Sequence, residues 1–234
     1  MSSHEKPMNV KGLSTQRAAI NLSLDPAMGL ADRLRDHTSA WHRRAERSGI
    51  VHELLHGRVS RQGYALFMRN LLPAYRQLEA ALEQHRDSAG IRHIARPETY
   101  RVAAIESDLR ALCGTRWQTA LPLLPPARDY AEHVAQAAAG EGVRLIAHAY
   151  VRYLGDLNGG RIIRQCLMRA PGLEPEALAF YEFLDIQELE RFKITYRASF
   201  DLAAIEITDV ESVIEEAVTA FRLNVEVSEA VAAQ

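Results

Sequence analysis

Two stretches of the sequence carry side chains that could do chemistry. In the first, W-H-R-R-A-E at residues 41–46, His42 precedes Glu46 by four residues. On a helix, a carboxylate at this spacing can accept a hydrogen bond from one ring nitrogen and orient the other toward a metal ion. The alternative is an amphipathic helix whose charged face includes a histidine–glutamate pair. His42 is therefore a candidate metal ligand whose assignment needs a second signal.

The second stretch lies within residues 145–168, whose apolar residues recur at helical spacing. Its centre reads G-D-L-N-G-G from Gly155 to Gly160. Each glycine inside a helix costs about 1 kcal/mol relative to alanine, so a helix that keeps three of them needs exposed backbone or a bend. Gly155 and Gly159 share one face, with Asp156 at its edge. A flat ligand could lie against this face, where the helix backbone is bare. The same spacing also lets a second helix pack closely, so the glycines alone leave both interpretations open.

In all, the sequence offers nine histidines, His42 included, and two cysteines for metal chemistry. Cys113 and Cys166 have no metal-type spacing and cannot form a disulfide framework. Haem iron needs only one strong protein ligand, so a site built on a single histidine stays open. The sequence has no phosphate-binding glycine loop and no nucleophile elbow.

The elements that must position these residues are helices. Proline, glycine and capping residues divide the chain, and no period-two alternation bounded by hairpin turns indicates strands. Pro73 predicts a kink inside one long helix, and Thr208-Asp209-Val210-Glu211 predicts a capping box before the last one. The chain is expected to be all-α, with a flexible tail over residues 1–24. The expected helices cover about 25–48, 51–55, 61–86, 97–114, 125–140, 142–169, 175–183, 186–204 and the segment from 208 toward the C-terminus.

Composition narrows the classes of protein. The formal net charge of -2 provides no basic field, so nucleic acid is not an implied partner. No apolar run of about 18 residues predicts a membrane span, and the first residues lack the apolar segment of a signal peptide. We therefore expect a soluble, cytoplasmic protein with reduced cysteines, and a monomer by default.

Considered together, the two stretches resemble the proximal-histidine and distal-glycine motifs of the heme oxygenases. The motifs are W-H-R-R-A-E at 41–46 and Y-V-R-Y-L-G-D-L-N-G-G at 150–160. The resemblance covers roughly residues 28–228 in the expected order. It implies one multi-helical domain over residues 25–234, with haem between a proximal helix and a kinked distal helix. It continues through H-G-R-V-S-R-Q-G-Y-A-L-F-M at 56–68, T-R-W-Q at 115–118, R-F-K-I-T-Y-R at 191–197 and V-I-E-E-A-V-T-A-F-R-L-N at 213–224.

The resemblance also implies a reaction. Heme oxygenases use haem as substrate and cofactor and cleave it to biliverdin, carbon monoxide and ferrous iron with dioxygen and external electrons. Cleavage at the alpha-meso carbon is the default expectation. The electron donor would be a ferredoxin, a flavodoxin or a flavoprotein reductase. The sequence resembles the soluble bacterial type because no hydrophobic anchor is evident at its C-terminus.

Site roles follow residue by residue from the same motifs. His42 would be the axial iron ligand, oriented by Glu46, and Asp156 would deliver protons through a hydrogen-bonded water. Gly155, Gly159 and Gly160 would let distal backbone lie close to the porphyrin. The side chains expected to hold the aspartate–water network are Tyr75, Tyr130, Arg152 and Asn224.

The haem propionates require cations at the mouth of the pocket. Lys193 and Arg197 share a face of one expected helix, and Tyr150 would add a hydroxyl. Arg35 lies two turns before His42. The family commonly has lysine at that position, so Arg35 departs from the pattern but keeps the charge.

Two other classes of protein remain to be weighed. The same scaffold could bind haem for sequestration, sensing or delivery without turnover. Asp156 distinguishes these readings, because storage needs an axial ligand and a pocket but no proton-relay carboxylate. A purely structural helical protein would take up no haem.

Overall fold

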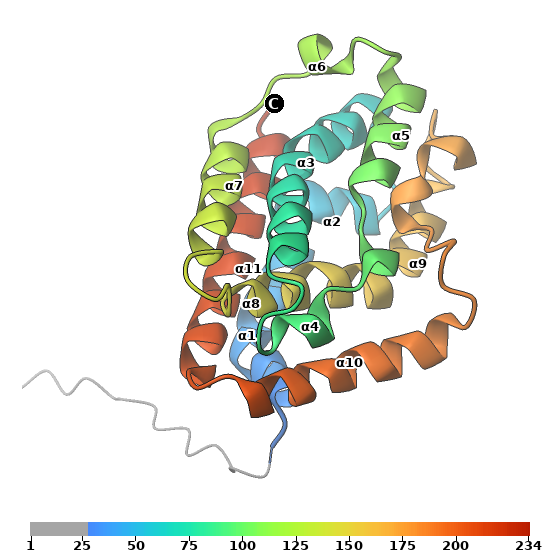
Figure 1. Ribbon diagram of the computed structural model, residues 1–234. Helices are drawn as coiled ribbons and strands as arrows, with labels where there is room; N and C mark the ends of the chain where they lie inside the picture. The colour runs from blue at the N-terminus through green and yellow to red at the C-terminus, as the bar shows by residue number, and fades with distance from the viewer. Residues whose placement is uncertain (1–27) are drawn as a thin grey trace, which may run out of the picture.

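The computed structural model describes residues 28–234 (Figure 1). The predicted tail over residues 1–24 and the predicted helix start at Asp25-Pro26 lie outside the described residues. Over the described range the chain forms helices and no strand, so the all-α prediction is confirmed. The α-helices are α1 (Leu30–Arg47), α2 (Gly49–Leu55), α3 (Arg61–Gln84), α4 (Ile91–Ile94), α5 (Val102–Cys113), α6 (Trp117–Ala120), α7 (Pro125–Ala137), α8 (Leu145–Ala149), α9 (Gly155–Leu167), α10 (Leu189–Glu206) and α11 (Val210–Ala232).

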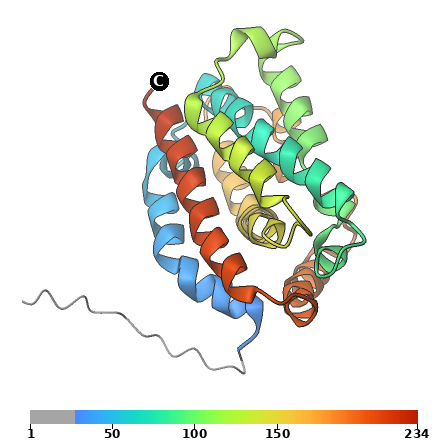
Figure 2. The same ribbon diagram turned by 60° about the vertical axis from the view of Figure 1, so that its left-hand side comes forward.

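The helices pack around α3. Figure 1 shows α3 between α5 and α7, with α10 crossing one end of the bundle. Figure 2 shows α1 beside α11. The Ser60 side chain accepts a hydrogen bond from the Gly63 backbone N–H at 3.0 Å and caps α3, which runs through Pro73 without interruption. The core centres on buried side chains of α3, including Tyr64, Met68, Leu71, Leu72 and Tyr75.

Helix α1 begins at Leu30, and residues 28–29 are not helical. The Asp201 carboxylate on α10 accepts a hydrogen bond from the Ala31 backbone N–H at 3.0 Å. A distant side chain therefore satisfies one of the N–H groups that a local capping residue would otherwise serve. The amphipathic pattern then holds, because Leu30, Leu34 and Ala45 are buried.

Two predicted helices differ from the structure because distant carboxylates end or start them. Residues 97–114 form a 3₁₀ turn, Pro97–Thr99, followed by a separate α5, and Glu79 of α3 accepts backbone N–H groups at the start of α5. Residues 175–183 form two 3₁₀ turns, Pro175–Ala177 and Ala179–Tyr181, instead of one helix. The Asp108 carboxylate holds the second turn through two backbone N–H groups.

The cap of the last helix also differs. Asp209, not Thr208, caps α11, because the Asp209 side chain accepts the Ser212 backbone N–H at 3.0 Å.

The segment predicted as one helix over residues 142–169 has three parts. A π-helical segment, Tyr150–Leu154, joins α8 to α9. Such segments widen a helix locally and often occur at functional sites. The widened turn directly precedes Gly155 and Asp156, so it sets the direction in which their backbone faces.

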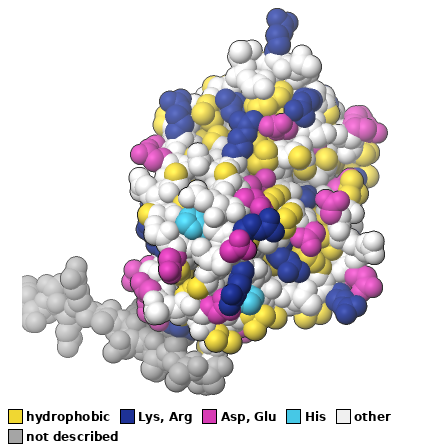
Figure 3. Space-filling model, viewed as in Figure 1, with side chains coloured by type: hydrophobic (Ala, Val, Ile, Leu, Met, Phe, Trp, Pro, Cys, Tyr) yellow, Lys and Arg dark blue, Asp and Glu magenta, His cyan; other side chains and the backbone are white. Residues whose placement is uncertain are grey.

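The surface carries both charge signs. Figure 3 shows Lys and Arg side chains interspersed with Asp and Glu on the face in view. Among the described helices, none combines the length and apolar character that crossing a bilayer requires.

Candidate functional site

A cleft of ≈ 580 Å³ lies between α1 and the segment formed by residues 150–163. Helices α2, α3, α10 and α11 contribute to its walls. Gly155, Gly159, His42 and several arginines line the cleft, and much of the remaining wall is apolar. The apolar side chains of the wall include Val51, Leu54, Phe67, Leu71, Leu154 and Phe221.

His42 extends into the cleft from the middle of α1. Its Nδ1 lies 3.4 Å from Oε1 of Glu46, and its ring packs edge-on to Phe221 with the centroids 5.9 Å apart. The His42 side chain is 58 % exposed, and among the described histidines it alone lines the cleft. With Nδ1 facing Glu46, Nε2 is left for a ligand in the cleft.

The bare face opposite His42 comes from α9. A Cβ atom added to Gly155 or Gly159 would meet no atom of another described element within 4 Å, and both residues line the cleft. Within residues 28–234, no other helix therefore packs against these positions, which favours a ligand surface over close helix packing. Gly160 differs from the prediction: it does not line the cleft, and an added Cβ would lie 3.3 Å from Cδ1 of Tyr181.

Asp156 is buried beside these glycines in a network of side chains from α3, α9, α11 and the π-helical segment. The Tyr75 hydroxyl of α3 donates to Oδ2 of Asp156, and Arg152 Nη2 lies 3.4 Å from Oδ1. The Arg152 guanidinium also donates to the Tyr75 hydroxyl, through Nε at 2.9 Å and Nη2 at 2.7 Å. Its Nη1 donates to Oδ1 of Asn224 on α11. Four of the residues predicted to act together are thus in direct contact.

The network changes the acidity of its members. Burial raises the pKa of Asp156, although the charge of Arg152 and the hydrogen bond from Tyr75 act to lower it. Burial also raises the pKa of Tyr75 well above its usual value. Arg152 is buried as well, but the neighbouring Tyr75 and Asp156 raise its pKa, so it remains a cation. Asp156 therefore takes up a proton more readily than an exposed aspartate, beside a fixed positive charge.

Tyr130 does not join this network. Its hydroxyl is buried and makes no hydrogen bond to any described residue, and its ring packs beside that of His148, with the centroids 5.9 Å apart. It is also absent from the cleft lining. No direct contact therefore supports the prediction that Tyr130 holds the aspartate network.

Cations gather at one end of the cleft. Arg35 of α1 and Arg197 of α10 both line it, and both contact Asp32 Oδ1, at 2.9 Å and 2.8 Å. Tyr150 lies with them: burial raises its pKa, while the charges of Arg197 and Arg35 act in the opposite direction. Lys193 does not line the cleft, and its Nζ pairs with Oε1 of Glu190 at 2.9 Å.

The structure adds residues that the sequence did not single out. Phe221 precedes Asn224 by three residues on α11, so the shared helix face could have indicated it. Arg43 also lines the cleft, and it makes no ion pair with any described residue. Nothing in its local sequence separates it from an ordinary surface arginine.

The sequence prediction also overlooked a metal-type pattern. His52-Glu53-Leu54-Leu55-His56 follows the H-E-x-x-H spacing. The two imidazole rings lie 4.2 Å apart, but Nδ1 of His56 bonds to the His52 carbonyl oxygen and Glu53 pairs with Arg58. No third ligand joins them in the part of the chain that the structure describes.

The lining of the cleft fits haem. A flat apolar macrocycle needs a hydrocarbon wall and a face free of side chains, which Gly155 and Gly159 provide. Its iron needs a nitrogen ligand on the other face, where His42 lies. Its two carboxylates need cations at one edge, where Arg35 and Arg197 lie together.

Comparisons with known proteins agree with this fit. The family model described as heme oxygenase matches residues 28–230. Heme oxygenase 1 of Synechocystis is 34% identical over 198 residues, covering 85% of this chain and 82% of that protein. Human heme oxygenase 1 is 35% identical over 205 residues, covering 86% of this chain and 70% of that protein.

Solved structures give the same result. The crystal structure of Synechocystis heme oxygenase-1 in complex with heme superposes with a TM-score of 0.81 at 33% identity, covering 87% of this chain and 92% of that one. The heme oxygenase of Leptospira interrogans also gives a TM-score of 0.81, at 31% identity, with 87% and 100% covered.

Proposed function

Since this chain belongs to the heme oxygenase family and is an enzyme that degrades haem, we propose how its own residues carry the reaction. His42 binds the iron through Nε2, and Glu46 orients its ring. Asp156 handles protons on the opposite face, and Arg35, Tyr150 and Arg197 bind the propionates. Biliverdin, carbon monoxide and ferrous iron are the proposed products.

The observation that supports His42 is its position in the cleft. His133 and His148 also form a possible metal-binding group with Glu216, but neither lines the cleft. Because His42 is the only described histidine that lines the cleft, it is the proposed ligand of an iron bound there. The neutral imidazole would be kept in one orientation by the Nδ1–Glu46 contact.

Bound haem supplies both the iron that activates dioxygen and the carbon framework that is cleaved. The chain's contribution on the distal side is a carboxylate with a raised pKa, held by Tyr75 and Arg152 at the edge of a bare glycine face. From this place Asp156 can hand protons to a water in the cleft and recover them. Because Gly155 and Gly159 present no side chain, backbone can approach the macrocycle and restrict where its reacting edge lies.

The choice of meso carbon depends on how the propionates are held. Arg35 and Arg197 share Asp32 and so mark one edge of the cleft. Carboxylates bound at this edge would fix the rotation of the macrocycle about the iron–histidine axis. We propose cleavage at the alpha-meso carbon, as is usual in the family. Lys193 would join these cations only if it exchanged Glu190 for a propionate.

The partners beyond haem are proposals from the resemblance. Electrons would come from a ferredoxin, a flavodoxin or a flavoprotein reductase, and the protein would act as a monomer. A cytoplasmic location agrees with Cys113 and Cys166, which are both free thiols.

One experiment tests the proposed reaction and its products. The haem complex, given a reductant and air, should lose its Soret band and gain the absorption of biliverdin while carbon monoxide is released. Chromatography of the product gives the isomer. A persistent Soret band without carbon monoxide would instead support the haem-binding module that turns nothing over.

A further inference from the structure

A second group of potential metal ligands lies outside the haem cleft. His133 of α7, His148 of α8 and Glu216 of α11 place Nε2, Nε2 and Oε1 within 4.8 Å of one another. Figure 2 shows α7 beside α11. We propose that these three residues form a binding site for a borderline divalent metal ion of the zinc and ferrous-iron class.

The contacts already have the form of a ligand set. Oε1 of Glu216 lies 2.7 Å from Nε2 of His133 and 2.8 Å from Nε2 of His148. Ligands at about 2.0–2.1 Å from a zinc ion are about 2.9–3.4 Å apart from each other. One ion could therefore replace the two N–H hydrogen bonds if Oε1 moved slightly away from both nitrogens and the two nitrogens, which lie within 4.8 Å of each other, moved closer together. Two imidazoles and one carboxylate leave coordination positions open, and they suit zinc or ferrous iron better than calcium or magnesium.

The surroundings of the three ligands support this use. Arg144 Nη1 lies 3.5 Å from Oε2 of Glu216, so it holds the carboxylate by the oxygen that the histidines do not use. Nδ1 of His148 is buried and has no hydrogen-bond partner among the described residues, so binding an ion through Nε2 would leave a buried Nδ1–H without an acceptor, a cost that the bonds to the ion must offset. His148 and Glu216 are buried, whereas the His133 side chain is 27 % exposed, which gives an ion a route from solvent.

The site would tie together three helices, and α8 leads into the π-helical segment of the haem cleft. Because the ligands come from different helices, an ion bound there would stabilise the folded chain relative to the unfolded one. This role is independent of the haem chemistry.

The test uses Zn²⁺ as probe on the full-length, haem-loaded protein after removal of metals with a chelator. Isothermal titration calorimetry should show one saturable Zn²⁺ site per chain. His133→Gln, a partly exposed position, should weaken it by about tenfold or more. His56→Gln removes one member of the H-E-x-x-H pair and should leave the affinity unchanged, which makes it the matched control.

X-ray absorption on the wild-type protein with one equivalent of Zn²⁺ is a second readout that needs no variant. It should show two histidine ligands and a carboxylate oxygen. Absence of a saturable site, an unchanged affinity in His133→Gln, loss of binding in His56→Gln, or a zinc shell without histidine would each overturn the proposal. Retained circular dichroism and Soret absorption establish that His133→Gln is folded.

Discussion

The Tyr75 hydroxyl donates a hydrogen bond to the Asp156 carboxylate, although the two residues lie 81 positions apart on α3 and α9. Arg152 contacts both partners. A buried carboxylate is thereby fixed in one orientation at the edge of the cleft, with a neighbouring cation that compensates its charge. A proton donor must have a fixed position before its acidity matters.

Asp156→Asn should keep haem binding and lose turnover. Asparagine preserves the shape and can still accept from Tyr75, but it cannot exchange protons. The rate of biliverdin formation should fall by about 100-fold or more, the usual size of a general acid–base contribution. Single-turnover spectra of the haem complex measure it. Tyr75→Phe, which removes only the orienting hydroxyl, should have a smaller effect, and a full biliverdin yield from Asp156→Asn would reject the relay role.

His42→Ala should remove the axial ligand while the fold persists, because the side chain is largely exposed in the cleft. The Soret band of the haem complex should shift, and turnover should fall to the background. Added imidazole should restore part of the spectrum by filling the space left. His56→Gln, on an exposed residue outside the cleft, serves as control. An unchanged spectrum in His42→Ala would refute the ligand assignment.

Gly159→Ala should stabilise the haem-free protein and weaken its binding of haem. A Cβ atom there would meet no atom of the other described elements within 4 Å, so haem-free protein should gain up to about 1 kcal/mol of unfolding free energy from helix propensity. The same methyl group would intrude on the haem face and cost about 1–3 kcal/mol of haem binding. Urea unfolding and haem titration measure the two effects. Gly160→Ala, which faces Tyr181, should leave haem affinity nearly unchanged; equal losses in both variants would contradict the assignment of the open face.

Much of this site could be predicted because its signals are local. His42 with Glu46, and Gly155 with Gly159, are each pairs at i and i+4, and helical geometry alone places them on one face. The resemblance then supplied Tyr75 and Asn224, which no spacing connects to Asp156. The roles expected of Gly160, Tyr130 and Lys193 depend on which way each faces after packing.

The fold shows the same division between local and distant causes. The all-α class follows from periodicity along the chain. The start of α1 and the breaks near residues 97–102 and 175–181 depend on carboxylates far away in sequence, Asp201, Glu79 and Asp108. A capping partner supplied by another helix leaves no signal in the sequence beside the helix end.

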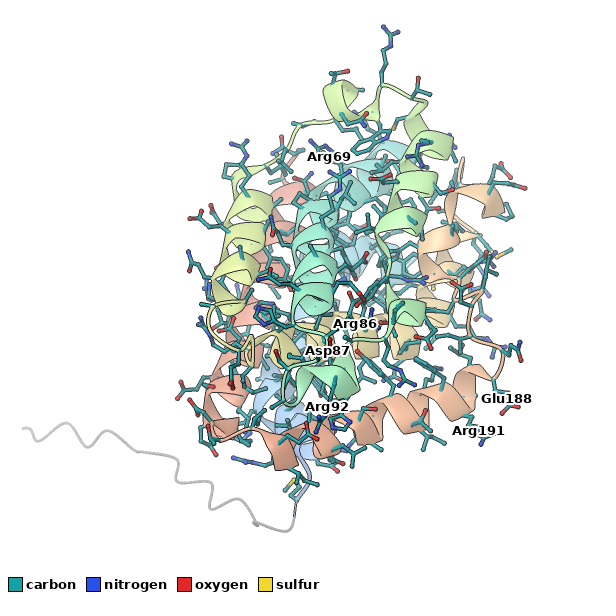
Figure 4. The ribbon with its side chains drawn as sticks, in the orientation of Figure 1. Arg69, Arg86, Asp87, Arg92, Glu188 and Arg191 are labelled. Atoms are coloured by element: carbon teal, nitrogen blue, oxygen red, sulfur yellow. The ribbon has the colours of Figure 1, made fainter. Side chains whose placement is uncertain are left out.

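Arg197→Gln should alter the product more than the rate. Losing one partly exposed cation would weaken haem binding by about fivefold, roughly 1 kcal/mol. It would also loosen the hold on one propionate, so biliverdin isomers other than alpha should appear in the chromatogram. Arg191→Gln is the control: Arg191 is on the same helix, and Figure 4 shows it at the end of α10 beside Glu188, with which it pairs at 3.5 Å. A pure alpha product from Arg197→Gln would show that this arginine does not set the orientation.

The raised pKa of Glu79 predicts that the stability of the fold depends on pH, independently of haem. Its Oε1 accepts the Arg101 and Val102 backbone N–H groups at 2.6 Å and 3.0 Å, and burial, opposed by these hydrogen bonds, raises its pKa from 4.5 to about 7. The folded chain therefore holds a proton on Glu79 that the unfolded chain has released. Its contribution is fully present below pH 4.5 and is lost as the pH rises through about 7.

Glu79→Gln is neutral at every pH and should remove this slope. Its unfolding free energy should match that of the wild type under acidic conditions and exceed it above neutral pH, by about 2–3 kcal/mol at most. Urea unfolding of haem-free protein across this pH range measures the difference between the two. Glu176→Gln, at an exposed position, should follow the wild-type curve. A constant difference between Glu79→Gln and wild type at all pH values would mean that the pKa of Glu79 is the same in the folded and unfolded chain, with the two backbone N–H groups offsetting its burial.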